Sequence, residues 1–529
     1  MLVISGDDAR STKLLPLLER HGYPVPAHPA AQKQLIAKIL NESPKDRVLL
    51  VERPGWHADR FVLGPETYGQ GGEPIMMGER LGQHLAQTGR CGRLSEWQAD
   101  VGEPSVRSSY LIFALSTGFA APLLRLTEIE SGGFHFWGPS SRGKSTLLRC
   151  AASIYGKGES ADAGYVRSWR VTCAAADEMS FGHCDLPLIL DELKLLDPDP
   201  VTAARRACEI AYAIATGTAK GRSHRYDGRV PIDLKHYRIL LMSAGEHSLE
   251  AQAAAGGSRR LRGEEARLID IPVPPGETGI FDRLPDGEPS SETRHLAESL
   301  QQGCTKCYGV AGWRFIRELA LELAEDQDGL RARLTHNIDR FLERAGVATS
   351  DGYEVRFARR FALVYAAALL AIDYEVVAWN EKLVLRCVRR VYRRALRQRS
   401  GAVETVEVAA RRLIRRVRKI DDLVDISTAG ASVDLDLAES ARVLLATHSD
   451  GSRLLAVQPE FFRSITGRHV AAPAVARCLE EQGVLVGRPN GRRTRQIRIP
   501  GSDKRRDYYC LRLDRIHPPK DRRHRGKPD

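Results

Sequence analysis

The chain has 529 residues and a formal net charge of +12, with 79 Lys and Arg residues against 67 Asp and Glu residues. This length exceeds one ordinary hydrophobic core, so two to four domains are expected. No segment reaches the roughly 18 consecutive apolar residues that a membrane span needs, and the first residues lack the pattern of a secretory signal. We therefore expect a cytoplasmic protein with no membrane partner.

Ten cysteines are scattered along the chain without regular spacing, which suits a reducing compartment better than a disulfide scaffold. Cys304 and Cys307 form one C-x-x-C pair. A zinc site needs a second such pair or nearby histidines, and none follows at a suitable spacing. We expect two ordinary thiols.

Residues 1–105 are expected to form an α/β accessory domain. Helical patterns precede a predicted strand pair in RVLLVERPGWHADRFVLG, with Trp56 and His57 in the turn between the two strands. From residue 106 to residue 290, short apolar runs alternate with helical stretches, which is typical of a parallel sheet with crossover helices. The fold class predicted for this core is α/β.

The stretch FHFWGPSSRGKSTLLR lies inside that pattern. Gly138 to Ser145 match the full phosphate-loop motif, with an apolar strand before it and a helical segment after it. In such a loop, backbone N–H groups surround phosphate oxygens, Lys144 reaches the β- and γ-phosphates, and Ser145 binds Mg²⁺. The alternative is a chance glycine turn. The predicted residues of this ATP site are Gly138, Pro139, Ser140, Ser141, Arg142, Gly143, Lys144, Ser145 and Thr146.

A second acidic element follows the apolar run in LPLILDE, which ends in Asp191 and Glu192. Asp191 is expected to hold the magnesium ion together with Ser145, and Glu192 to polarise the attacking water as general base. Two acids after a strand can also simply cap the next helix. Combined with the phosphate loop, they predict that ATP is hydrolysed as well as bound.

The segment ATGTAKGRSHRYDGRV is basic and contains glycines. Lys220 and Arg222 within it are predicted to contact a nucleic-acid backbone, because flexible basic loops can follow phosphates. Contact with the nucleotide phosphates, or no contact at all, are the alternatives.

A third predicted strand, in YRILLMSAGE, ends in polar residues. Ser243 is predicted to orient the water beside the γ-phosphate, although a serine at a strand end can also be a turn former. Arg267 stands immediately before the apolar run LIDIP and is predicted as an arginine finger donated to a neighbouring subunit. A surface salt bridge is the alternative for Arg267.

Residues 291–400 are expected to form a helical domain. After residue 400 the pattern predicts an arginine-rich helix in VAARRLIRRVRKI, two short helices in ESARVLLATH and QPEFFRSIT, and a further helix in AAPAVARCLEEQG. A hairpin is expected in VLVGRPNGRRTRQIRIP, because Asn490-Gly491 is a strong turn signal. Helices followed by a basic hairpin indicate a winged-helix-like domain over residues 401–529, and the alternative is a generic helical tail with one hairpin.

The excess positive charge is concentrated at the C-terminal end. From residue 488 to residue 529 there are 15 Lys and Arg residues against 5 Asp and Glu residues. Such a block favours a polyanion as partner, although the last residues can also be a solvated tail. The residues of the hairpin predicted to contact nucleic acid are Arg488, Arg492, Arg493 and Arg495.

One known family resembles most of the chain. The matching runs, in the family's order, are WQADVGEPSVRSSYLIFALSTGFAAPLL, GGFHFWGPSSRGKSTLLRCAASIYG, SWRVTCAAADEMSF, LILDE, AYAIATGTAKGR, ILLMSAGEHSL and EEARLIDIP. They resemble the uncharacterised P-loop ATPase domain family of primase-helicases carried by bacterial plasmids, phages and genomic islands. GWHADRFVLGPETYG and RFALVYAAALLAI also fit this family.

The resemblance implies a superfamily III or AAA+ like helicase ATPase that uses ATP and Mg²⁺ and works on single-stranded or forked DNA as a homo-oligomeric ring. Relatives are often fused to an N-terminal primase, whereas residues 1–105 leave no room for a full one. The predicted architecture is therefore a P-loop NTPase core at residues 106–290, an N-terminal accessory domain, a helical domain and a winged-helix-like domain.

Two other functions are compatible with the same residues. The first is a DNA-associated ATPase switch or loader, including a defence sensor, that changes partners without unwinding DNA. The second is a non-enzymatic DNA-binding protein that uses nucleotide only for assembly. The intact Glu192 argues against the second, and strand displacement coupled to ATP hydrolysis would favour the motor over the switch.

Overall fold

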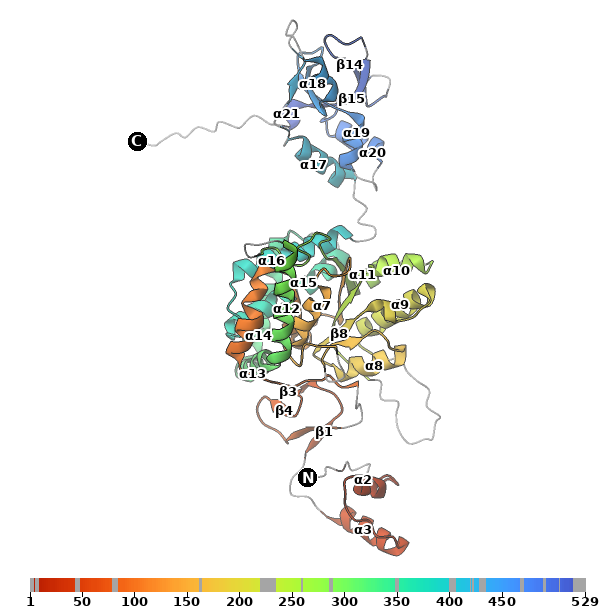
Figure 1. Ribbon diagram of the computed structural model, residues 1–529, viewed down its shortest axis with the longest axis vertical. Coiled ribbons are helices and arrows are strands. Elements are labelled where there is room, and N and C mark those ends of the chain that lie inside the picture. The colour runs from red at the N-terminus through yellow and green to blue at the C-terminus, as the bar shows by residue number, and fades with distance from the viewer. Residues whose placement is uncertain are drawn as a thin grey trace, which may run out of the picture. The chain divides into compact units, whose positions relative to one another are not determined.

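The computed structural model describes residues 4, 9–42, 48–78, 84–160, 164–218, 235–257, 260–284, 289–347, 352–398, 406–418, 420, 423–427, 434–466, 471–488, 491–503 and 505–516. The chain divides into two compact units, residues 1–399 and 400–529 (Figure 1). Both units combine helices with strands. The finer division of the first unit into residues 1–105, 106–290 and 291–400 remains a prediction.

A five-stranded parallel sheet forms the centre of the first unit. Its strands stand in the order β10-β6-β9-β8-β7, and each neighbouring pair is parallel. The expectation of a parallel α/β core is therefore confirmed. The strands are β6 (Gly132–Trp137), β7 (Arg167–Ser168), β8 (Pro187–Asp191), β9 (Leu240–Gly245) and β10 (Leu268–Pro272).

Helices cover both faces of this sheet, with α7, α12, α14 and α16 on one side of β8 and α8 and α9 on the other (Figure 1). Successive strand residues alternate between two cores, as Leu241 and Met242 of β9 show. Burial on both faces explains why the strands are continuous apolar runs. The helices of the two layers are α5 (Ser109–Ala120), α7 (Lys144–Ala152), α15 (Gly352–Asp373) and α16 (Glu381–Gln398) on the first, and α8 (Cys173–Gly182) and α9 (Pro200–Thr216) on the second.

Helix α5 is buried along its whole length and packs against α7, α15 and α16. The stretch Ser109–Thr127 that contains it is long and apolar enough to cross a membrane, but 89% of its most apolar window is buried inside the protein. This is the burial of a helix in the hydrophobic core of the protein.

The region after the sheet is helical, as expected, and Arg360 of α15 ties it to the sheet. This guanidinium is buried and donates hydrogen bonds to the carbonyl oxygens of Glu130 and Ser131 at 3.0 and 2.9 Å, where β6 begins. Burial lowers the pKa of Arg360 to about 10. This region also contains α12 (Pro289–Lys306), α13 (Val310–Glu325) and α14 (Gln327–Ala345), whereas α10 (Leu249–Ala255) and α11 (Arg262–Arg267) lie between β9 and β10.

The N-terminal region contributes a small antiparallel sheet, and here one prediction is wrong. Trp56 and His57 lie in a strand, and the turn falls at Ala58 and Asp59, because His57 pairs with Arg60. The Trp56 ring is buried, and its Nε1 atom donates to the carbonyl of Pro122 at 2.9 Å, so the strand is fixed against the core. The elements of this region are α2 (Leu14–Arg20), α3 (Pro29–Asn41), β1 (Leu49–Val51), β2 (Gly55–His57), β3 (Arg60–Leu63), β4 (Glu66–Tyr68), β5 (Ile75–Met77) and α4 (Leu94–Trp97).

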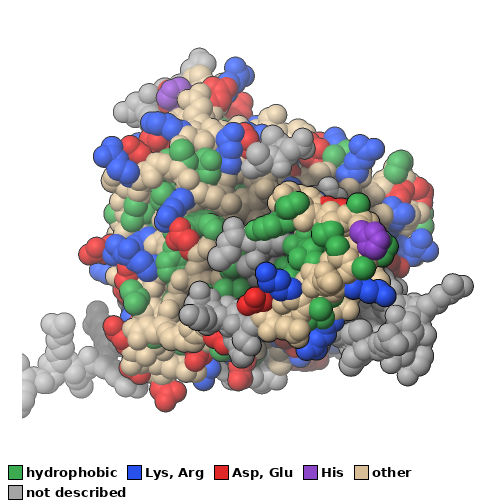
Figure 2. Space-filling model, turned by 90° about the horizontal axis from the view of Figure 1, so that it is seen from below, with side chains coloured by type: hydrophobic (Ala, Val, Ile, Leu, Met, Phe, Trp, Pro, Cys, Tyr) green, Lys and Arg blue, Asp and Glu red, His purple; other side chains and the backbone are tan. Residues whose placement is uncertain are grey.

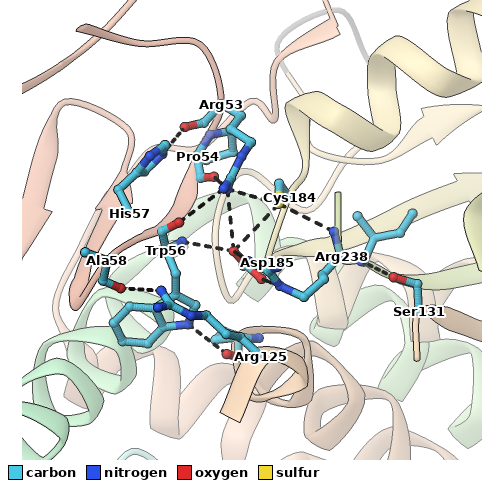
Figure 3. A network of polar contacts seen from close by, with 12 residues as sticks. Arg53, Pro54, Trp56, His57, Ala58, Arg125, Ser131, Cys184, Asp185 and Arg238 are labelled. Atoms are coloured by element: carbon cyan, nitrogen blue, oxygen red, sulfur yellow. Dashed lines mark hydrogen bonds and ion pairs between the residues drawn. The ribbon is translucent and has the colours of Figure 1, made fainter. Parts of the chain in front are cut away.

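A buried carboxylate joins this sheet to the core (Figure 3). Asp185, just before β8, accepts two hydrogen bonds from Arg238 at 2.8 and 3.1 Å and one from the backbone N–H of Trp56 at 2.9 Å. The Arg53 guanidinium lies 3.7 Å from the same carboxylate. Gly55 allows this approach, because a Cβ atom there would lie 2.5 Å from Asp185 Oδ2. A buried charge is stable only when it is paired in this way.

The face drawn in Figure 2 carries Lys and Arg side chains interspersed with Asp, Glu and hydrophobic side chains. No single sign of charge dominates the side chains described on that face. It is therefore not a surface on which the net positive charge is gathered.

The second unit has a five-stranded sheet in the order β11-β12-β13-β15-β14, against which α17, α19 and α20 pack. The segment ESARVLLATH was expected to be helical but instead contains the end of a helix and the strand β12. The elements are α17 (Val406–Val417), β11 (Val424–Asp425), α18 (Leu435–Ser440), β12 (Val443–Thr447), β13 (Arg453–Val457), α19 (Pro459–Thr466), α20 (Ala472–Glu481), β14 (Arg495–Arg498), β15 (Arg505–Arg512) and α21 (Leu513–Ile516).

The pairing expected through Asn490-Gly491 is also different in the structure. Both apolar runs of that segment pair with β15 and not with each other. The backbones of Val484 and Val486 form hydrogen bonds with Arg512 and Cys510, at the carboxyl end of β15. Strand β14 pairs with residues 505–508, at the amino end of β15. The long strand β15 therefore organises this part of the sheet.

Candidate active site

The segment predicted to be a phosphate loop connects β6 to α7. Gly143 stands at the N-cap of α7 with φ +86°, and a Cβ atom there would lie 2.7 Å from the side chain of Ile280. Only glycine fits this position without strain. The N-terminus of α7 therefore points its free N–H groups into the cleft, where an anion would bind.

Lys144 is held inside the loop by two backbone carbonyls. Its Nζ atom donates to the oxygens of Gly138 and Pro139, each at 2.7 Å. Burial lowers the pKa of Lys144, and the charges of Glu246 and Asp191 oppose that effect. The ammonium is thus positioned beside the space that phosphates would enter.

The acidic pair, Asp191 and Glu192, lies at the carboxyl end of β8. One strand, β9, lies between β8 and β6, the strand that precedes the phosphate loop. Asp191 ends the strand, and its Oδ1 atom accepts the backbone N–H of Glu192 at 2.9 Å. Glu192 has φ +61°, a left-handed conformation that is costly for a residue with a side chain. Such strain is found where a side chain is held for a function.

A cleft of about 910 Å³ brings these groups together. It is lined by the loop from Ser140 to Thr146, by Asp191 and Glu192, and by the end of β9. Mg²⁺ bound to a nucleotide typically takes one or two protein oxygens and several oxygens from phosphates and water. Ser145 and Asp191 both line the cleft and supply oxygens of that kind, so they fit a magnesium ion, whereas no cluster of three or more metal-binding side chains occurs in the described residues.

Five residues of α12 line the cleft and were not anticipated from the sequence. Those with charged or amide side chains are Arg294, Glu298 and Gln301. Gln301 donates to the Thr146 hydroxyl at 3.0 Å and accepts from Arg149 at 2.8 Å, which ties α12 to α7. Arg294 is exposed at the cleft and adds its positive charge to those of the other basic residues that line it, Arg142, Lys144 and Lys194. No local pattern marks these residues, because they lie on an ordinary amphipathic helix.

Ser243 does not line the cleft. It is fully buried, its hydroxyl accepts from Trp169 Nε1 at 2.8 Å, and it lies 2.9 Å from His135 Nδ1. A neutral His135 satisfies this chain by accepting from Ser243 and donating from Nε2 to the carbonyl of His247 at 2.9 Å. Burial lowers the pKa of His135, which agrees with the neutral form. Ser243 is therefore not one of the residues that line the cleft, although Ala244, which follows it, is.

Glu246 is the polar residue at the end of β9 that does reach the cleft. Its Oε1 atom accepts from the Ser140 hydroxyl at 2.6 Å. The sequence placed Ser243 and Glu246 together at a strand end, and strand alternation within β9 separates them.

Arg267 ends α11 at the amino end of β10, the strand beside β6, whereas the phosphate loop follows the carboxyl end of β6. Its guanidinium lies 5.2 Å from the centre of the Tyr212 ring. The nearby Arg260 is different, since it is buried and forms a 3.1 Å ion pair with Asp270. Arg267 is not among the residues that line the cleft of the same chain.

The residues predicted to contact nucleic acid have several different environments. Lys220 and Arg222 lie outside the described residues. Two hairpin arginines are paired with acids, Arg488 with Asp507 at 3.5 Å and Arg493 with Glu480 at 2.8 Å. Arg495 donates to the carbonyl of Gly487 at 3.3 Å, and Arg492 also has an interaction partner.

Both thiols of the C-x-x-C pair are buried, and their role as ordinary thiols stays a prediction. Cys304 lies 3.6 Å from the Sγ atom of Cys150, whereas Cys307 donates to the carbonyl of Arg93 at 3.2 Å. All ten cysteines are free thiols. The two residues of the motif therefore have different neighbours and share no ligand.

Known proteins provide two comparisons. A family described as a domain of unknown function (DUF927) matches residues 9–230, which include the phosphate loop, Asp191 and Glu192. A solved structure described as SCCmec type IV Cch, an active helicase, is similar with a TM-score of 0.55 at 16% identity, over 96% of this chain and 88% of that chain. No curated protein matches. The chain therefore has a mixed α/β fold that it shares with a helicase of a mobile element.

Proposed function

We propose that this protein is a cytoplasmic, ATP-dependent DNA motor of a mobile genetic element, a helicase of the replicative type that works as a homo-oligomeric ring. The observation that carries the proposal is the cleft in which Lys144, Ser145, Asp191 and Glu192 meet. A nucleotide pocket alone would support binding, and the carboxylate of Glu192, which lines the same cleft as Lys144, supports hydrolysis. The helicase-like fold supports DNA as the partner.

Each residue has a defined task in this proposal. The backbone N–H groups of the loop and of α7 hold the phosphates, and Lys144 exchanges its two carbonyl partners for phosphate oxygens. Ser145 and Asp191 would hold Mg²⁺, which neutralises phosphate charge when bound. Glu192 takes the proton of the attacking water, and Arg267 is proposed to serve the cleft of a neighbouring subunit.

Ser243 is proposed to act indirectly. Through His135 it fixes the backbone at His247, which directly follows Glu246. This makes Glu246 the better candidate for a group that contacts the water or the γ-phosphate. The C-terminal unit is proposed to bind DNA, because α19 and α20 precede β14 and β15 in it, as helices precede the basic hairpin of a winged helix.

The test is hydrolysis of ATP by the purified full chain, alone and with single-stranded or forked DNA, together with strand displacement on the fork. Lys144→Ala is expected to lose nucleotide binding, whereas Glu192→Gln is expected to bind ATP and lose turnover. The proposal fails if the wild-type chain releases no phosphate, or if Glu192→Gln turns over at the wild-type rate. DNA-stimulated hydrolysis without strand displacement would favour the switch or loader.

A further inference from the structure

A second large groove lies in the C-terminal unit, between α17, α19 and the start of β12. Its volume is about 720 Å³, and three arginines line it, namely Arg412, Arg416 and Arg442. Phe461 and Ser464 of α19 form part of its wall. None of these residues belongs to the hairpin that the sequence marked for nucleic acid.

The arginines of α17 are divided between two faces of the helix. At about 100° per residue, Arg412 and Arg416 border the stripe of buried residues, whereas Arg411 and Arg415 point away from it. Arg412 also donates to the carbonyl of Ile465 at 3.1 Å, which fixes its position at the end of α19. Two of the four arginines of α17 therefore line the groove.

The groove combines positive charge with an aromatic ring. The Arg442 guanidinium lies over the ring of Phe461, 5.5 Å from its centre. Among the described residues that line the groove, Glu460 is the one carboxylate beside the three arginines. The hairpin is different, because Arg488 and Arg493 are each paired with an acid.

We propose that this groove binds the sugar-phosphate backbone of DNA, with phosphates on Arg412, Arg416 and Arg442 and a base against Phe461. Guanidinium groups bind phosphate through two parallel N–H donors, and bases stack on aromatic side chains. An acidic peptide would use the arginines but would leave the aromatic surface without a role. The proposal rests on the proposed function in that it takes DNA as the partner, and it assigns the contact to the groove and away from the hairpin.

The experiment measures binding of the full chain to a fluorescent oligothymidylate and to a duplex of equal length, over a series of salt concentrations. The variant is Arg412→Ala/Arg416→Ala/Arg442→Ala. Loss of three phosphate contacts should lower the magnitude of the log–log salt slope by roughly 2 for the single strand and roughly 2.7 for the duplex. Affinity at about 0.1 M salt should fall on the order of 10- to 100-fold.

The matched control is Arg411→Ala/Arg415→Ala/Arg477→Ala, which removes the same charge from exposed positions that do not line the groove. It should change the slope by less than half as much. A second test pair, Arg416→Gln/Arg442→Gln, keeps the carbonyl contact of Arg412 in case the triple variant does not fold. Arg492→Ala/Arg495→Ala compares the hairpin directly.

The proposal that the groove binds DNA is overturned if the folded triple variant keeps the wild-type DNA affinity and salt slope. If the triple variant does not fold, the same outcome in Arg416→Gln/Arg442→Gln overturns it. It is also overturned if the charge-matched control loses as much as the groove variant, or if the wild-type chain binds neither DNA. Hydrolysis of ATP without DNA is measured in parallel. Failure of that activity would count against the proposed motor, whereas the salt slopes report on the groove alone.

Discussion

The hydroxyl of Ser140 in the phosphate loop donates a 2.6 Å hydrogen bond to the carboxylate of Glu246 at the end of β9. This hydrogen bond is the largest of the effects that lower the pKa of Glu246 below its ordinary value. Lys144 meanwhile donates to two carbonyls of the same loop. The loop therefore satisfies its own polar groups, and entering phosphates have to replace both sets of partners.

Replacing Glu246 by Gln should tighten ATP binding and slow its hydrolysis. The carboxylate opposes the phosphate charges in the ground state, and at an effective dielectric constant between water and protein its removal should improve affinity roughly threefold or more. Turnover should fall because the side chain at position 246 no longer carries the negative charge that attracts a proton of the attacking water. Equilibrium binding of ATP and phosphate release measure the two effects.

Ser140→Ala is the control for Glu246→Gln. It removes the hydrogen bond but keeps the negative charge, so it should not tighten ATP binding. If both substitutions raise the affinity equally, release of the loop and not the charge of Glu246 is the cause.

Arg294→Ala should weaken ATP binding roughly tenfold. Arg294 lines the cleft from α12, and a hydrogen bond between a guanidinium and a charged group contributes about 1.5 to 3 kcal/mol. His295→Ala removes the next exposed side chain of α12, which does not line the cleft, and should leave the affinity unchanged. Equal losses in the two variants would mean that α12, and not Arg294, supports the site.

The fold could be predicted where strands are continuous apolar runs between helices, and it could not where a run is short. Val443 and Leu445 belong to one core of the second unit and Leu444 to another. Because both faces of β12 are buried, the run has no alternation that would distinguish a strand from a helix. The partner strand β15 lies well beyond the Asn490-Gly491 turn, and a turn signal reports only on its immediate neighbours.

The candidate site could be predicted where its residues lie in contiguous sequence motifs. The phosphate loop and the pair Asp191 and Glu192 are contiguous patterns, whereas Arg294 and Gln301 come to the cleft from a helix more than a hundred residues away from them. Ser243 was chosen over Glu246 because the sequence gives the end of a strand but not the side on which each residue lies.

Acid should destabilise the chain through His183. This side chain is fully buried, its Nδ1 atom lies 2.8 Å from the carbonyl of Met179, and burial lowers its pKa to about 3. The unfolded chain takes up this proton first as the pH falls below about 6.5. Stability is therefore complete above that pH and decreases toward pH 3, with a slope from this one group of about 1.4 kcal/mol per pH unit.

His183→Asn should remove that slope, because the amide can still donate to Met179 and does not titrate. Urea midpoints between pH 7 and pH 4.5, followed by tryptophan fluorescence, measure it. The matched control is His336→Asn at an exposed position of α14, which should keep the wild-type dependence. A wild-type slope in His183→Asn would show that other groups carry the acid sensitivity.

The final prediction concerns Arg267 and the ring. Arg267 stands at the amino end of β10, whereas the phosphate loop follows the carboxyl end of the parallel neighbour β6. Five strand residues, roughly 16 Å, separate the two ends, so Arg267 is too far from the nucleotide of its own chain.

Arg267→Ala should therefore bind ATP but lose roughly 10³-fold in turnover, whereas Arg262→Ala, on the exposed side of the same short helix, should remain active. Mixing Arg267→Ala with Lys144→Ala should restore part of the activity, because some interfaces then pair an intact loop with an intact arginine. Absence of recovery in oligomers shown by light scattering to be mixed would make Arg267 a structural residue. Diluting either variant with wild-type chain separates that result from strict cooperativity, since only a cooperative ring loses activity faster than the fraction of variant subunits rises.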